Sequence, residues 1–157
     1  MPHVLLLAGL MLLITPDLPA QETGPWGSAR EVEKAYAPAK VVYDLSSGSA
    51  AHLTDILDRV SLLSTLYGAD PFDASIVVVV HGDAILRFTT GAYAENRDLM
   101  QRAQSLTVGN VIEFRMCRAS ARSMGIAPTD VHGFVTMVPM ADAEIAQLHR
   151  NGYVYMK

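Results

Sequence analysis

After residue 38, segments with the hydrophobic pattern of strands alternate with segments in which apolar residues recur at the helical period. Five short runs rich in β-branched or aromatic residues predict strands, at Lys40 to Leu45, Ser75 to His81, Val111 to Met116, Gly133 to Val138 and Tyr153 to Met156. The second of these runs reads SIVVVVH and is apolar at nearly every position. Such a run is typical of a strand that is buried on both faces of a parallel sheet.

Helical periodicity separates these strands. Residues His52 to Tyr67 place an apolar stripe on one helix face, formed by Leu53, Ile56, Leu57, Val60, Leu63 and Tyr67. Further helices are predicted over Ala94 to Leu106, Arg118 to Met124 and Ala141 to Arg150, with a short helical turn at Asp83 to Thr89. Strands that alternate with helices predict an α/β protein, a three-layer α/β/α sandwich around a five-stranded parallel sheet.

The first 38 residues form a separate region. Val4 to Ile14 reads VLLLAGLMLLI, which is short for a membrane span but typical of the apolar part of a signal peptide. We therefore expect a signal peptide over residues 1–20, an N-terminal arm over 21–38 and one domain over 39–157, in a protein that is periplasmic or secreted. The alternative is an uncleaved segment that tethers the chain to a membrane. Once the signal peptide is removed, we expect the chain to contact no membrane.

Composition excludes several classes of protein. The 157 residues carry 12 Lys and Arg against 16 Asp and Glu, a formal net charge of -4, which disfavours non-specific binding to nucleic acid. A single cysteine excludes an intrachain disulfide and a four-cysteine zinc site. The histidines show no metal-ligand spacing, and we expect neither a metal ion nor a cofactor.

Candidate chemistry lies where the predicted strands end. In open parallel sheets the ligand crevice is outside the carboxyl ends of the strands, because helix N-termini meet there. This rule selects four segments: Ser46-Ser47-Gly48-Ser49, His81-Gly82-Asp83, Cys117-Arg118 and Pro139-Met140. Ser46, Ser47, Gly48, Gly82 and Pro139 are candidate ligand-binding positions, although small polar residues also suit an ordinary turn.

Cys117 is the candidate nucleophile. It lies directly after a strand and directly before a helix, whose N-terminus and Arg118 would favour the thiolate. His81, with Asp83 beside it, is a candidate base or proton shuttle. The alternatives are a buried structural cysteine, and a histidine bonded to local backbone with Asp83 as a helix cap.

Four segments resemble the DsrE/DsrF-like family of small α/β proteins: KVVYDLSSG, VVVVHGDAI, FRMCRASARSMGI and GFVTMVPMADAEIAQLHRNGYVYMK. The resemblance covers about residues 39 to 157. It implies a five-stranded parallel sheet, assembly into homo- or hetero-oligomers, commonly trimers or hexamers, and sulfur-relay work. In such work a cysteine accepts sulfane sulfur as a persulfide and passes it to a partner, and Cys117 matches the cysteine of the single-domain branch.

Three functions follow as hypotheses. The first is a homo-oligomeric sulfur carrier with a persulfide on Cys117 and a sulfur donor or acceptor protein as partner. The second is a non-catalytic, oligomeric module that binds a small molecule in the same crevice. The third is a flavin or nucleotide protein. A flavin would need an aromatic residue to stack on near the later strand ends, and the sequence places no Trp there.

Overall fold

The computed structural model describes residues 27–157. The predicted signal peptide and the start of the predicted arm lie outside the described residues. All described helices and strands belong to one compact unit, Tyr36–Lys157. No helix in the described part of the chain is long and apolar enough to cross a membrane.

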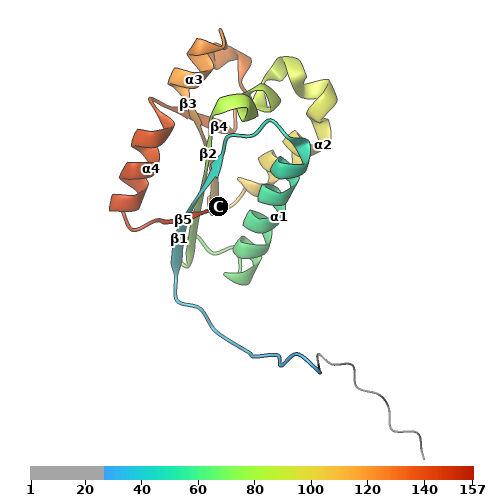
Figure 1. Ribbon diagram of the computed structural model, residues 1–157, viewed down its shortest axis with the longest axis vertical. Helices are drawn as coiled ribbons and strands as arrows, with labels where there is room; N and C mark the ends of the chain where they lie inside the picture. The colour runs from blue at the N-terminus through green and yellow to red at the C-terminus, as the bar shows by residue number, and fades with distance from the viewer. Residues whose placement is uncertain (1–26) are drawn as a thin grey trace, which may run out of the picture. The chain divides into compact units, whose positions relative to one another are not determined.

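Five parallel strands form one sheet in the order β4-β3-β2-β1-β5 (Figure 1). Their bounds are β1 Ala39–Leu45, β2 Ala74–Val80, β3 Ile112–Cys117, β4 Val135–Val138 and β5 Val154–Met156. The predicted α/β fold with a five-stranded parallel sheet is confirmed. Strand β4 begins two residues later than predicted, because the Val135 N–H bonds the His132 carbonyl at 3.1 Å and closes a turn there.

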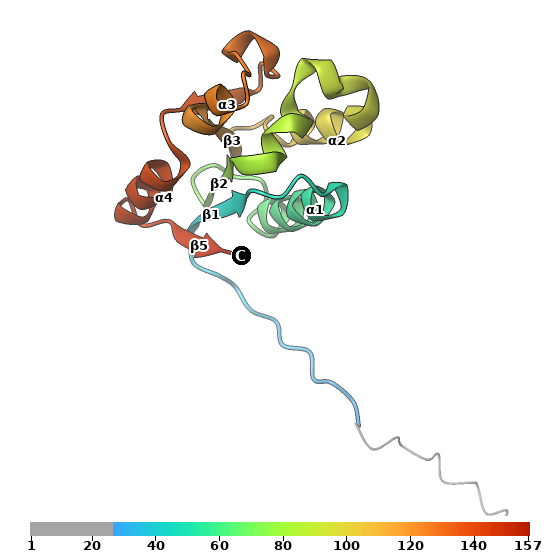
Figure 2. The ribbon, with the colours of Figure 1, turned by 45° about the horizontal axis from the view of Figure 1, so that its top comes forward.

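Helices lie on both faces of this sheet (Figures 1 and 2). Helices α1 (Ala50–Leu66) and α2 (Tyr93–Leu106) cover one face, and α4 (Ala141–Arg150) covers the other. Helix α3 (Arg118–Ser123) follows β3 at the carboxyl end of the sheet, and 3₁₀ segments run over Gly82–Phe88, Thr90–Ala92 and Pro128–Asp130. Helix α1 begins before the predicted His52 because the Ser49 hydroxyl accepts the His52 N–H at 3.4 Å and caps it.

Side chains alternate between two cores, as the pleat of each strand requires. Val41, Tyr43 and Leu45 of β1 join the larger core beneath α1 and α2. The smaller core lies under α4 and comprises Val42, Val77, Val79, Cys117, Ala141 and Leu148. The cysteine therefore faces α4.

The loops after β1 and β2 pack directly against each other. Gly82 has a φ of +54°, and a Cβ there would lie 3.0 Å from the Ser46 carbonyl oxygen. A Cβ on Gly48 would lie 3.1 Å from the Asp83 carbonyl oxygen. Only glycine satisfies both the left-handed backbone and the close approach at residue 82, and this turn sets the position of His81.

Candidate functional site

Cys117 ends β3 and caps the N-terminus of α3. Its sulfur accepts two hydrogen bonds from Ser120, from the backbone N–H at 3.4 Å and from the hydroxyl at 3.3 Å. The residue is only 3% exposed. The strand-to-helix junction thus directs donor groups at the sulfur.

The pKa of the Cys117 thiol is lowered from its ordinary value. Burial acts in the opposite direction, but the hydrogen bonds from the Ser120 side chain and backbone and from the Ala141 and Ala119 N–H groups outweigh it. Arg118 is exposed, and its side chain forms no ion pair or hydrogen bond in the described structure. Neutral donors, and not the predicted arginine, therefore stabilise the thiolate.

His81 pairs with a carboxylate that the sequence analysis did not select. Its Nε2 lies 2.5 Å from Asp44 Oδ1, and both side chains are about one quarter exposed. The other Asp44 oxygen, Oδ2, accepts a hydrogen bond from the Tyr155 hydroxyl at 2.8 Å. Asp83 is exposed in the following 3₁₀ segment, and the structure does not bring its side chain to His81.

Sheet register brings His81 and Cys117 to neighbouring positions. Val80 of β2 is aligned with Met116 of β3. His81 follows Val80, and Cys117 follows Met116, so these two residues come next to each other at the strand ends. Strand alternation places His81 on the same face as Val77 and Val79, which is the α4 face. Strands β1, β2 and β3 are neighbours in the sheet (Figure 1). The register therefore places Asp44, His81 and Cys117 one after another across these strands on one side of the sheet.

The loop predicted to cradle a ligand mostly bonds to the protein itself. The Ser46 carbonyl accepts the Ala84 N–H at 3.1 Å, and the Ser47 hydroxyl accepts the Ser49 N–H at 3.2 Å. The Gly48 carbonyl accepts Nε of Arg87. These contacts are those of a structural turn. The turn also packs the carboxyl end of β1 against Gly82.

Pro139 does lie near the cysteine. Val138 is aligned with Cys117 in the sheet, and the Pro139 carbonyl accepts the Ala119 N–H at 3.2 Å. The chain then turns into α4, whose first residue, Ala141, directs its N–H at the sulfur. The start of α4 thus forms one wall of the Cys117 site.

A cavity of about 600 Å³ opens beside this site between α4 and the β1–β5 edge of the sheet. We call it the α4 groove. It includes Asp44, the carboxylate that holds His81. The residues that line it are Val42, Asp44, Asp142, Ile145, Ala146, His149, Arg150 and Tyr155.

Comparison with known proteins decides the family. Residues 40–157 match the DsrE/DsrF-like family. The chain belongs to the DsrE/DsrF-like family. A DsrE-like fold is also seen in MTH1491, a protein of unknown function from Methanobacterium thermoautotrophicum, with a TM-score of 0.61 and 16% sequence identity over 75% of this chain and 97% of that one. No curated protein matches the chain.

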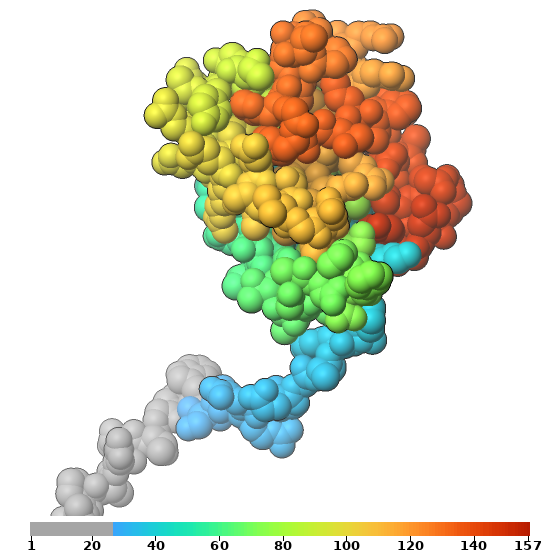
Figure 3. Space-filling model, turned by 180° about the vertical axis from the view of Figure 1, so that it is seen from behind, coloured from blue at the N-terminus to red at the C-terminus, as the bar shows by residue number. Residues whose placement is uncertain are grey.

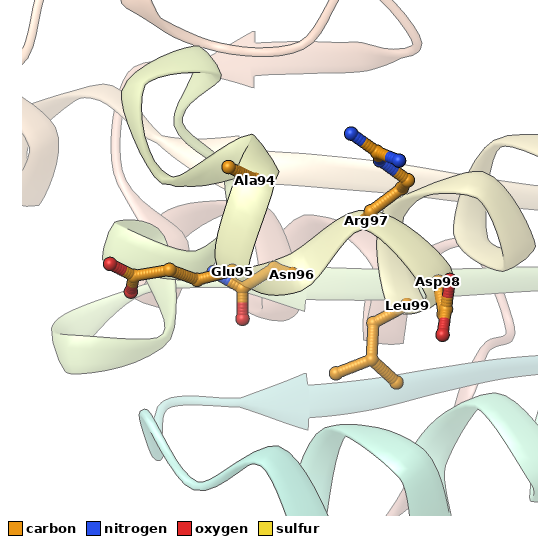
Figure 4. Close-up of a pocket in the computed structure, with 6 residues that line it drawn as sticks. All are labelled: Ala94, Glu95, Asn96, Arg97, Asp98 and Leu99. Carbon is orange, nitrogen blue, oxygen red and sulfur yellow. The ribbon is translucent and has the colours of Figure 1, made fainter.

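A second hollow in this DsrE/DsrF-like domain lies at a kink in α2. Asn96 has non-helical backbone angles, φ −117° and ψ 17°, and a cavity of about 460 Å³ adjoins it. Glu95, Arg97 and Leu99 point away from one another (Figure 4), and the Asn96 side chain bonds Arg87 Nη1 at 2.6 Å and the Ala92 carbonyl at 3.0 Å. These side chains do not converge on a site.

Three residues of the Cys117 site were missed by the sequence analysis: Asp44, Ser120 and Tyr155. Asp44 was detectable, because a carboxylate inside the apolar strand KVVYDL needs a partner if it is not to be exposed. Within residues 27–157, no cluster of three or more His, Cys, Asp or Glu side chains is placed to hold a metal ion.

Proposed function

We propose that this DsrE/DsrF-like chain is a sulfur carrier, in which Cys117 takes up sulfane sulfur as a persulfide and passes it to an acceptor. The observation that carries the proposal is the placement of the thiol: it caps α3, its pKa is lowered, and the His81–Asp44 pair follows it across the sheet. Low-pKa thiols beside a positioned base are the usual nucleophiles of thiol chemistry. Family membership supports the same assignment.

The reaction needs no oxidant. The Cys117 thiolate attacks the outer sulfur of a donor R–S–SH, the S–S bond of the donor breaks, and a new bond joins that sulfur to Cys117 Sγ. The donor leaves as R–S⁻ and takes a proton, for which His81 is the available acid. An acceptor thiolate then attacks the outer sulfur in the same way and releases Cys117 as thiolate.

The chain holds only one cysteine, so no second thiol of the same chain can attack a persulfide on Cys117. The sulfur must therefore pass to another molecule. We propose that the carrier is a homo-oligomer, a trimer or hexamer, that acts in the periplasm or after secretion, with a donor or acceptor protein as partner. Light scattering of the purified protein tests the subunit number, and fractionation of cells tests the location.

Mass spectrometry tests the carrier directly. Incubation with an inorganic polysulfide should add about 32 Da to the intact protein, and reduction should remove it. The addition should be absent in Cys117→Ser. Unmodified wild-type protein after treatment with several sulfane-sulfur donors would contradict the proposal.

The burial of Cys117, at 3% exposure, favours a second candidate, a non-catalytic module that binds a small molecule. The α4 groove would then be the binding site and the cysteine a core residue. In that case Cys117→Ser should bind the molecule as tightly as wild type, and wild type should form no persulfide.

A further inference from the structure

We propose that the α4 groove binds the organic part of the sulfur donor, and that this donor is the persulfide of a short thiol peptide with a free amine and a carboxylate. This inference rests on the proposed sulfur-carrier function and names its substrate class. It is carried by three observations: the link from the groove through Asp44 and His81 to Cys117, the chemistry of the groove lining and the burial of the thiol.

The groove runs along α4 away from the cysteine. We call the end nearer the cysteine its upper end, and Asp44 and Asp142 lie there. Asp44 holds His81. Asp142 follows Ala141, whose N–H faces the sulfur. The lower end of the groove is at Arg150, eight residues beyond Asp142, which is about 12 Å along the helix axis. A short peptide in extended form spans about this length at roughly 3.4 Å per residue.

The lining has both apolar and charged parts. Val42, Ile145, Ala146 and the Tyr155 ring offer a surface for a carbon chain, which an inorganic polysulfide lacks. Tyr155 is also fixed by its hydrogen bond to Asp44. A ligand that covers these groups removes apolar area from water, so the groove favours an organic donor.

The charges at the two ends have opposite sign. Asp142 lies at the upper end, and Arg150 lies at the lower end. In the described part of the chain neither Asp142 nor Arg150 forms an ion pair, and the Arg150 guanidinium is held at 2.8 Å by the Gln147 amide oxygen. This pattern complements a dipolar ligand whose amine is near Asp142 and whose carboxylate is near Arg150.

The burial of Cys117 selects a small donor over a cysteine on a protein surface. With 3% of the residue exposed, a persulfide on a short, flexible peptide reaches the sulfur more readily than one on a folded protein surface. Asp44 at the upper end of the groove holds His81, and His81 is the neighbour of Cys117 in the sheet register. The outer sulfur of the bound persulfide then moves to Cys117 Sγ, and the peptide leaves as a thiol with a proton from His81.

Binding is tested with S-methylglutathione, a short peptide with a blocked thiol, by calorimetry on wild type, Arg150→Gln and Arg122→Gln. Arg122 is a matched control, because it is an exposed arginine in the last turn of α3 outside the groove. We expect Arg150→Gln to weaken binding about fivefold, as for an exposed ion pair, and Arg122→Gln to leave it unchanged. No binding to wild type, or equal affinity in all three proteins, would overturn the inference.

Sulfur loading separates this inference from the proposed function. Glutathione persulfide should load Cys117 about fivefold more slowly in Arg150→Gln than in wild type, while inorganic polysulfide should load both at the same rate. Equal rates with glutathione persulfide overturn the groove as donor site and leave the carrier function standing. No loading by either donor overturns the carrier function and the donor assignment together, even where S-methylglutathione binds.

Discussion

His81 and Asp44 lie 37 residues apart in the chain and 2.5 Å apart in space, Nε2 to Oδ1. The pairing exists because β1 and β2 are parallel neighbours, with Asp44 aligned with Val79 and His81 two residues further on. The carboxylate fixes the imidazole ring on the face where β3 presents Cys117. In the proposed carrier, this pair is the oriented proton-transfer group for the thiol.

Removal of the Asp44 charge should slow sulfur transfer. In Asp44→Asn, His81 loses its oriented partner, and we expect the rate of transfer from the Cys117 persulfide to a small thiol to fall about tenfold. Stopped-flow or quenched mass spectrometry measures this rate. Asp83→Asn is the matched control, since Asp83 lies two residues after His81 without contacting it. An equal loss in both variants would contradict the role given to Asp44.

The turn at Gly82 should tolerate no side chain. Gly82→Ala forces alanine into a left-handed conformation and brings its Cβ to 3.0 Å from the Ser46 carbonyl. We expect the free energy of unfolding to fall by about 2 kcal/mol, measured by urea denaturation. Gly133→Ala, where a Cβ meets nothing within 4 Å and φ is unexceptional, should change it little; comparable losses would show that the turn is not the cause.

The hydroxyl of Ser120 should contribute to the low thiol pKa. Ser120→Ala removes the hydroxyl donor 3.3 Å from the sulfur, so the pKa of Cys117 should rise. The backbone N–H donor at 3.4 Å remains and should still lower that pKa. The ultraviolet absorbance of the thiolate against pH reports it. Ser123→Ala, which removes a hydroxyl bonded to the Ser120 carbonyl on the same helix, should leave the thiol pKa in place.

His132 should make the domain sensitive to acid. Burial lowers the pKa of His132, and its Nε2 is buried with no hydrogen-bond partner. The ring of His132 contacts the rings of Tyr93 and Phe134. Tyr93 begins α2, and α2 lies beside the segment before β4 on one face of the domain (Figure 3). The folded chain thus binds this proton more weakly than the unfolded chain does. Its stabilising contribution is complete above the unfolded value of about 6.5 and is lost as the pH falls below it.

Urea denaturation between pH 7.5 and 5 should therefore show a smaller loss of stability in His132→Phe than in wild type. Phenylalanine keeps the ring contact with Phe134, which has centroids 5.8 Å apart. The exposed His149→Gln should follow wild type. Parallel curves for wild type and His132→Phe would contradict the assignment.

The fold was predictable because the apolar positions in the sequence are the positions that the helices and strands bury. The apolar stripe of α1 is buried at Leu53, Ile56, Leu57 and Val60, and β2 is buried from Ile76 to Val80 as its sequence indicates. These elements form from local periodicity and from the right-handed crossover between parallel strands. Their sequence therefore contains the needed information.

The site was predictable only in part. Cys117 and His81 follow from the rule on strand ends, but the partner of His81 depends on strand order and register, which no local pattern records. Asp83 is nearer in sequence, yet the positive φ of Gly82 turns the chain away after His81. Arg118 follows the cysteine in sequence, yet the sulfur is contacted by Ser120, one helical turn further along α3.

The reaction rate of Cys117 with a small alkylating reagent, measured against pH, tests the central claim most directly. A thiol held by the α3 N-terminus and Ser120 should give a midpoint below the ordinary thiol value of about 8.5, and appreciable labelling at neutral pH. A midpoint at or above about 8.5 with slow labelling across the range would contradict the account and make Cys117 a structural residue of the core under α4.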